Sequence, residues 1–198
     1  MRILVTGFLL ILATGLALSQ EAYFLSASEI KIDGISTIHD WTSDVTKASV
    51  NGKFSLENNL LSSLTDVSVQ INAKDIKSTK GSIMDGKTWD ALKADKYPKI
   101  SFKSNELVAL KHSGSNSAFQ LKGSLTIAGV TRNTTLDVNT EALADGKIRF
   151  HGFKTIDMTD FDMEAPTALM GTIKTGKDVT IRFDVTMAPK AILSSDRK

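Results

Sequence analysis

Residues 119–130 read Phe-Gln-Leu-Lys-Gly-Ser-Leu-Thr-Ile-Ala-Gly-Val, and this stretch decides the fold class of the chain. Apolar and small residues occupy every second position from Phe119 to Ile127, and polar residues fill the positions between them. Alternation with a period of two residues is typical of a strand with one face in the core and the other in water. The alternation breaks after Ile127, and residues 134–138 resume it. The stretch therefore predicts two antiparallel strands joined by a tight turn.

The same alternation recurs along the chain and predicts eight strands. The expected strands cover residues 28–35, 48–56, 67–73, 100–110, 119–127, 134–141, 148–158 and 179–187. Asp145-Gly146 is a dipeptide typical of a hairpin turn. Because no strand–helix unit repeats, a parallel sheet is not expected. The pattern alone allows either a β-sandwich or a barrel.

Residues 74–96 interrupt the strands and are rich in Lys, Asp, Ser and Gly. They predict a long connection with a short helix that Thr88 caps, ended by Pro98. Residues 81–88 also match the phosphate-loop pattern G-x-x-x-x-G-K-[ST]. That motif needs a strand directly before it, which is missing here, and Asp85 would place a negative charge beside the phosphates. Nucleotide binding is therefore not expected.

Two motifs in a fixed order resemble those of a known family. They are Tyr97-Pro98-x-Ile100-x-Phe102-x-Ser104, and then Gly123-x-Leu125-Thr126-Ile127-x-Gly129-Val130-Thr131 with Leu136. In these residues, and over most of the chain after residue 25, the sequence resembles the YceI-like lipid- and polyisoprenoid-binding family. The resemblance implies an all-β, eight-stranded antiparallel lipocalin-like barrel with one short helical excursion between strands. It also implies a long isoprenoid chain held inside that barrel.

Apolar residues on the strand faces and in the irregular segments are the candidate ligand contacts. By pattern alone they would form a filled core, because protein interiors are close-packed. The family resemblance instead implies that some of them line an apolar cavity. The cavity candidates are Val50, Phe54, Val69, Ile71, Phe102, Phe119, Leu121, Leu125, Phe150, Met158, Phe161, Leu169, Met170, Ile181 and Phe183. Trp41 and Trp89 lie beside irregular segments and are further candidates for its mouth or lid.

The first 19 residues predict a secretory signal peptide. They combine Arg2, an apolar run and small residues at Ala17 and Ser19, which favours cleavage after Ser19. The alternative is a membrane anchor, but the run of about sixteen residues is shorter than the roughly 20 that a bilayer requires. Residues 20–198 are then one YceI-like β-barrel domain, exported to the periplasm of a bacterium or secreted.

Composition excludes several functions. With no cysteine, the chain has no disulfide, thiolate metal site or thiol nucleophile, and its net charge of +2 argues against nucleic acid as a partner. The histidines His39, His112 and His151 have no metal-ligand spacing, so no metal site is expected. Loop carboxylates could form an acid–base pair, although solvated loop charge is the commoner explanation. These are Asp90, Asp95, Asp160, Asp162 and Glu164.

These observations predict an exported, non-catalytic protein without a cofactor. Its partner would be an amphiphilic lipid, a polyisoprenoid or a quinone-like molecule, and transient contact with a membrane remains open. The first alternative is a secreted structural or interaction domain with a packed core. The second is a small-molecule hydrolase that uses the loop carboxylates. The sequence leaves the oligomeric state open.

Overall fold

The computed structural model describes residues 23–58, 60–168 and 171–189. The predicted signal peptide and two cavity candidates, Leu169 and Met170, lie outside these residues. The strands are β1 (Tyr23–Ser36), β2 (Trp41–Val45), β3 (Ser49–Glu57), β4 (Leu60–Asn72), β5 (Ile76–Ser78), β6 (Lys99–Ser113), β7 (Asn116–Ile127), β8 (Val130–Ala142), β9 (Ile148–Asp157), β10 (Thr167–Ala168) and β11 (Ile173–Pro189). The helices are α1 (Ser82–Ala91) and the 3₁₀ turns η1 (Ala73–Asp75), η2 (Ala144–Gly146) and η3 (Met158–Phe161).

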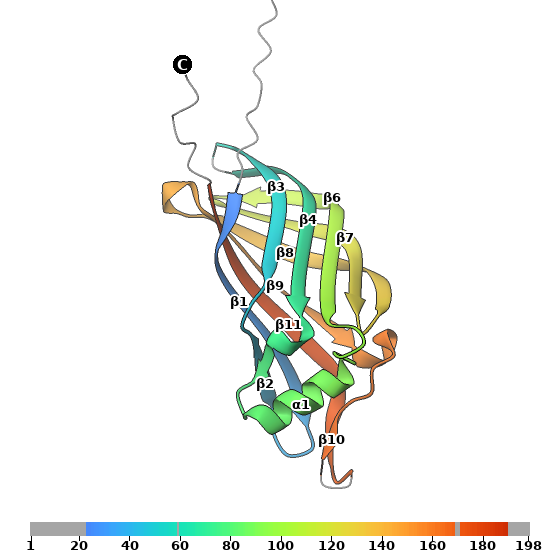
Figure 1. Cartoon of the computed structure of the whole chain (residues 1–198). Helices are drawn as coiled ribbons and strands as arrows, with labels where there is room; N and C mark the ends of the chain where they lie inside the picture. Colours follow the sequence, from blue (N-terminus) through green and yellow to red (C-terminus); the bar gives the residue numbers. More distant parts are fainter. Residues whose placement is uncertain (1–22, 59, 169–170, 190–198) are drawn as a thin grey trace, which may run out of the picture.

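The strands form one antiparallel sheet that curls around an apolar interior (Figure 1). Its strand order is β3-β4-β6-β7-β8-β9-β11-β1-β2-β5, with β10 beside β11. Within the described residues no hydrogen-bond ladder joins β3 to β1. Instead the ring of Tyr23 on β1 lies 3.8 Å from that of Phe54 on β3, centroid to centroid. The predicted all-β antiparallel class is therefore confirmed, and side-chain packing closes this side of the curl.

The predicted number of eight strands is wrong, because the described residues contain eleven. The three strands that the pattern missed are β2, β5 and β10. β5 and β10 have three and two residues, too few to show a period of two. β2 reads Trp-Thr-Ser-Asp-Val, and its polar Ser43 is the buried residue, so it carries no apolar alternation.

β7 follows the predicted alternation, with Phe119, Leu121, Leu125 and Ile127 buried. The turn that follows β7 explains why Tyr97 and Gly129 occur together in the two motifs. Gly129 has a φ of +83°, and a Cβ there would lie 2.5 Å from the ring of Tyr97. Glycine is required because the backbone is left-handed and the tyrosine ring lies directly on it. Tyr97 thus fixes the start of β6 against the β7–β8 turn.

The predicted short helix is α1, at the lower end of the barrel in Figure 1. Thr88 does not cap it, because the helix begins at Ser82 after Gly81 and contains Thr88. Tertiary contacts hold α1 instead: the Trp89 indole N–H donates to the Ile76 carbonyl on β5 at 3.1 Å, and the Lys87 ammonium donates to the Thr167 carbonyl on β10 at 2.7 Å. None of the described helices has the length and apolar character needed to cross a bilayer.

Candidate functional site: two adjoining apolar cavities

The larger of the two apolar cavities lies inside the end of the barrel that α1 covers, and we call it the first cavity. Its volume is about 320 Å³. Its walls come from β1, β2, β4 to β7, β9 to β11 and α1, and most of its lining is aliphatic. Its exposed lining residues mark where it reaches solvent, and we call them the mouth: Ile38, His39, Lys80 and Thr167.

The second cavity, of about 170 Å³, lies between the long strands farther from α1. Four phenylalanines on four different strands line it: Phe54, Phe102, Phe150 and Phe183. The ring of Phe54 meets that of Phe150 edge-on at 5.6 Å between centroids. Aromatic rings prefer this geometry, which holds both side chains in one position against the wall.

Four isoleucines belong to the walls of both cavities, and we call them the isoleucine waist: Ile30, Ile71, Ile100 and Ile181. Ile71 on β4 is the direct cross-strand partner of Ile100 on β6. Ile30 on β1 lies diagonally from Ile181 on β11, because Ile32 is the direct partner of Ile181. The two cavities therefore adjoin across a ring of branched aliphatic side chains.

A glycine supports the wall of the second cavity. A Cβ on Gly123 would lie 2.8 Å from the ring of Phe102 and 2.3 Å from the Lys103 carbonyl oxygen. The ring of Phe102 on β6 therefore lies directly over Gly123 on β7 and leaves no room for another side chain. This explains why Gly123 and Phe102 occur together in the two motifs.

Comparison with known proteins decides the family. The family model for the YceI-like domain matches residues 23–187. The chain belongs to the YceI-like family. Several solved structures share its fold at low sequence identity. BcnA of Burkholderia cenocepacia is 18% identical, with a TM-score of 0.62 over 80% of this chain and 95% of that one. A polyisoprenoid-binding domain of Saccharophagus degradans, implicated in plant cell wall breakdown, is 14% identical, with a TM-score of 0.63 over 86% and 99%.

The YceI protein of Campylobacter jejuni is 22% identical, with a TM-score of 0.57 over 75% of this chain and 84% of that one. No curated protein matches the chain. At these identities the structural likeness establishes the fold, and the cavity residues of this YceI-like chain must be read from its own geometry.

Most of the predicted cavity residues line one of the two cavities. Those that line the second cavity are Val50, Phe54, Val69, Ile71, Phe102, Leu121, Leu125, Phe150, Ile181 and Phe183. Met158 lines the first cavity. Phe119 and Phe161 are each 3% exposed and line neither cavity, so they belong to the packed core. Whether any of these residues contacts a ligand stays a prediction.

The two tryptophans have different surroundings. Trp41 lines the first cavity. Trp89 does not; its indole is tied to β5, and the Lys77 ammonium lies 4.1 Å from the ring centroid. Both residues lie beside irregular segments of the sequence, and only the fold distinguishes their surroundings.

Sequence reasoning missed Lys154, a cation on the inner face of β9. It lies on the same face of the strand as Gly152 and Ile156 and borders the second cavity. The ladder between β8 and β9 runs from Asp137↔Phe153 to Ala142↔Ile148, so the described strands are unpaired beyond that point. The Lys154 ammonium donates to the Thr135 carbonyl there at 3.1 Å, which satisfies an acceptor that has lost its ladder partner.

The phosphate-loop match does not form a phosphate site. Gly81 precedes α1 and the other seven residues of the match lie on it, where Asp85 is 7% exposed. The Asp85 carboxylate accepts a hydrogen bond from the Ser78 backbone N–H at 2.6 Å and lies 3.5 Å from the Lys77 ammonium. Asp85 therefore anchors the start of α1 to β5, which is a structural role.

The loop carboxylates do not gather at a cavity. None of the five candidates lines either cavity, and Asp95 is paired with Lys74 at 2.7 Å. Among the described residues no group of three or more His, Asp or Glu side chains could hold a metal ion. The Nδ1 atom of His112 lies 2.9 Å from the Ser117 hydroxyl, so that ring has a structural partner.

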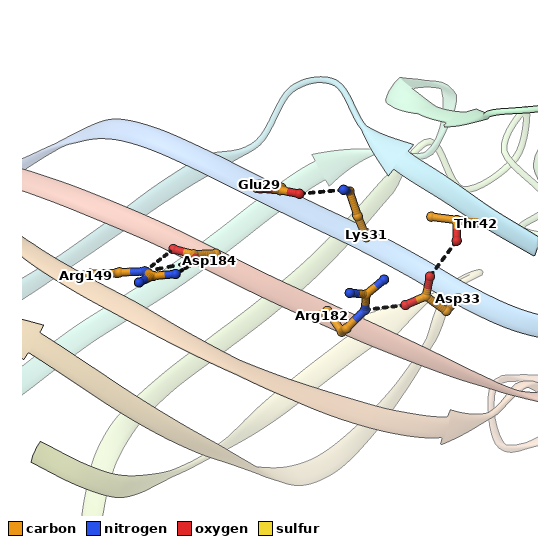
Figure 2. Close-up of polar contacts among 7 residues, drawn as sticks. All are labelled: Glu29, Lys31, Asp33, Thr42, Arg149, Arg182 and Asp184. Carbon is orange, nitrogen blue, oxygen red and sulfur yellow. Dashed lines mark hydrogen bonds and ion pairs between the residues drawn. The ribbon is translucent and has the colours of Figure 1, made fainter.

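The outer face of the barrel carries ion pairs that alternate with the cavity residues. Figure 2 shows Arg182 beside Asp33 and Arg149 beside Asp184 across neighbouring strands. Each guanidinium lowers the pKa of its carboxyl partner below the usual value. On β1 the isoleucines at positions 30 and 32, which line the first cavity, alternate with charged residues at positions 29, 31 and 33. Successive side chains of a strand point to opposite faces, so the charged residues lie on the outer face and the interior stays apolar.

Proposed function

We propose that this protein binds the apolar chain of a polyisoprenoid or quinone-like lipid without catalysing a reaction. The observation that carries the proposal is the pair of adjoining apolar cavities with a mouth at one end of the barrel. Each buried CH₂ group contributes about 0.8 kcal/mol, so a long chain needs few polar contacts to bind. The polyisoprenoid-binding description of the Saccharophagus degradans domain, which has the same fold, supports this choice of ligand.

The interior chemistry suits hydrocarbon. Among the described residues, every buried side-chain nitrogen or oxygen has a hydrogen-bond partner. No such group is therefore left to recognise a polar ligand deep in the barrel. The lining of branched aliphatic and aromatic side chains is the type that small apolar ligands require.

Export and transient membrane contact complete the proposal. The basic and apolar start of the sequence, with small residues at Ala17 and Ser19, supports cleavage of a signal peptide after Ser19. Ile38 at the mouth is 61% exposed and Ile83 on α1 is 79% exposed. Apolar side chains around a lipid entrance would let the protein rest on a bilayer while the chain moves.

The test uses the intrinsic fluorescence of the two tryptophans. Protein freed of lipid is titrated with an isoprenoid quinone, which quenches indole emission at short range. We expect saturable quenching at one ligand per protein. Trp41→Phe should remove most of the response, because Trp41 lines the first cavity, whereas Trp89→Phe should retain it. Quenching that does not saturate in the unmodified protein would refute the proposal.

A further inference from the structure

The mouth of the first cavity is basic. Two lysines line the first cavity on this side: Lys80 belongs to the mouth, and the Lys87 ammonium lies beside Thr167 of the mouth. No Asp or Glu is among the lining residues of the cavity. The interior that this mouth leads to is apolar. The charge at the entrance is therefore positive and is not balanced within the wall.

Neither lysine is neutralised by a carboxylate. The Lys87 ammonium donates to a backbone carbonyl, that of Thr167, which carries no net charge. The Lys80 ammonium has no hydrogen-bond or ion-pair partner among the described residues. By contrast, Lys77 beside them faces the Asp85 carboxylate at 3.5 Å. The cations at the mouth are thus available to a charge that arrives from outside.

Hydroxyl groups accompany these cations. Ser78 on β5 and Thr88 on α1 also line the first cavity, whereas the Ser36 hydroxyl there already donates to the His39 carbonyl at 2.7 Å. An ammonium and a hydroxyl together donate several hydrogen bonds to an oxyanion, and charge-assisted bonds are about twice as strong as neutral ones.

We infer that Lys80 and Lys87 bind the anionic headgroup of an amphiphile whose apolar chain lies in the cavities. This rests on the proposed function and adds the headgroup class. A carboxylate and a phosphate monoester share the required chemistry, a singly attached oxyanion at the end of one chain. A neutral alcohol would enter the same cavity but leave both ammonium groups without an anionic partner.

The test compares four ligands that share one isoprenoid chain: the alcohol, the amine, the carboxylic acid and the monophosphate. Binding is measured by calorimetry on protein freed of lipid. We expect the two acids to bind about tenfold to a hundredfold more tightly than the alcohol, and the amine to bind most weakly. The ratio between the acids then distinguishes a carboxylate ligand from a phosphate ligand.

Variants locate the headgroup. The double variant Lys80→Gln, Lys87→Gln should lose most of the preference for acids and retain its affinity for the alcohol. The control is Lys47→Gln, Lys111→Gln, which removes the same charge from lysines that line neither cavity. Lys154→Met removes the cation that borders the second cavity and should also leave the preference unchanged.

The outcomes separate the two claims. Equal affinity for alcohol and acids would overturn the headgroup assignment while the proposed function stands. If the preference for acids disappears in Lys154→Met but survives in the double variant Lys80→Gln, Lys87→Gln, the placement of the headgroup at the mouth is wrong. If none of the four ligands binds, both the headgroup assignment and the proposed function fail.

Discussion

The isoleucine waist predicts that a single enlarged side chain will set the length of chain that the protein can hold. Ile181 lines both cavities, and tryptophan in its place would fill the space through which a chain passes from the first to the second. We expect Ile181→Trp to bind short chains as the unmodified protein does and to stop gaining affinity once a chain fills the first cavity.

The magnitude follows from the area that the longer chain would bury. In the unmodified protein each further methylene should add about 0.8 kcal/mol, which is about a fourfold decrease in Kd. Four methylenes that reach the second cavity would together contribute about 3 kcal/mol, or about two hundredfold. Ile181→Trp should gain almost no affinity from methylenes that would extend beyond the isoleucine waist.

The assay is calorimetric titration with a homologous series of straight-chain amphiphiles that share one headgroup. Ile181→Leu, which keeps the side-chain volume, is the matched control and should keep the full dependence on chain length. Ile100→Phe narrows the waist from β6 and gives a second route if the tryptophan variant folds poorly. An unchanged slope in both enlarged variants would refute the view that the cavities form one channel.

Three further predictions concern the core, a half-buried surface carboxylate and the mouth. Phe119→Ala should destabilise the fold by about 3–5 kcal/mol in chemical denaturation and leave ligand affinity unchanged, because Phe119 is buried away from both cavities; a weakened affinity would contradict its assignment to the core. Bonds from Lys177 and Thr159 lower the pKa of Asp157 to about 2, so its carboxylate stabilises the fold above its ordinary pKa and loses this effect as the pH falls through about 2. Asp157→Asn should therefore lower Tm most at pH values above 4 and hardly at all near pH 2, and a difference in Tm that is independent of pH would disprove this. The double variant Ile38→Ser, Ile83→Ser should take up lipid from vesicles more slowly, with its affinity in detergent unchanged. The control is Phe24→Ser, which removes another exposed apolar side chain, on β1, and should leave the rate unchanged. Equal uptake rates for the double variant and the unmodified protein would exclude membrane contact through the mouth.

The sequence predicted those parts of the fold that local alternation determines. β7 alternates over its whole length, and each of its large apolar residues is buried. β5 could not be predicted, because three residues carry no period and its strand geometry depends on pairing with β2. The start of α1 could not be predicted either, because the Ser78–Asp85 hydrogen bond joins it to that same short strand.

The candidate site was predictable in type but not in detail. Alternation predicted the same inward position for Phe102 and Phe119, yet Phe102 lines a cavity and Phe119 does not. The difference depends on how strongly the sheet curls, to which all of its strands contribute. The waist likewise combines Ile71 and Ile100 on β4 and β6 with Ile30 and Ile181 on β1 and β11. These two pairs of strands are not neighbours in the sheet, and they line the same cavities only because the sheet curls.

The central claim is that the barrel holds a lipid chain, and native mass spectrometry of the purified protein tests it most directly. The protein is measured as purified, and its lipid is then extracted into organic solvent and identified. We predict one bound molecule whose mass contains repeating isoprene units, with an acidic headgroup. A protein that purifies empty and takes up neither isoprenoid quinones nor isoprenoid acids would contradict the account and favour a domain that binds another protein.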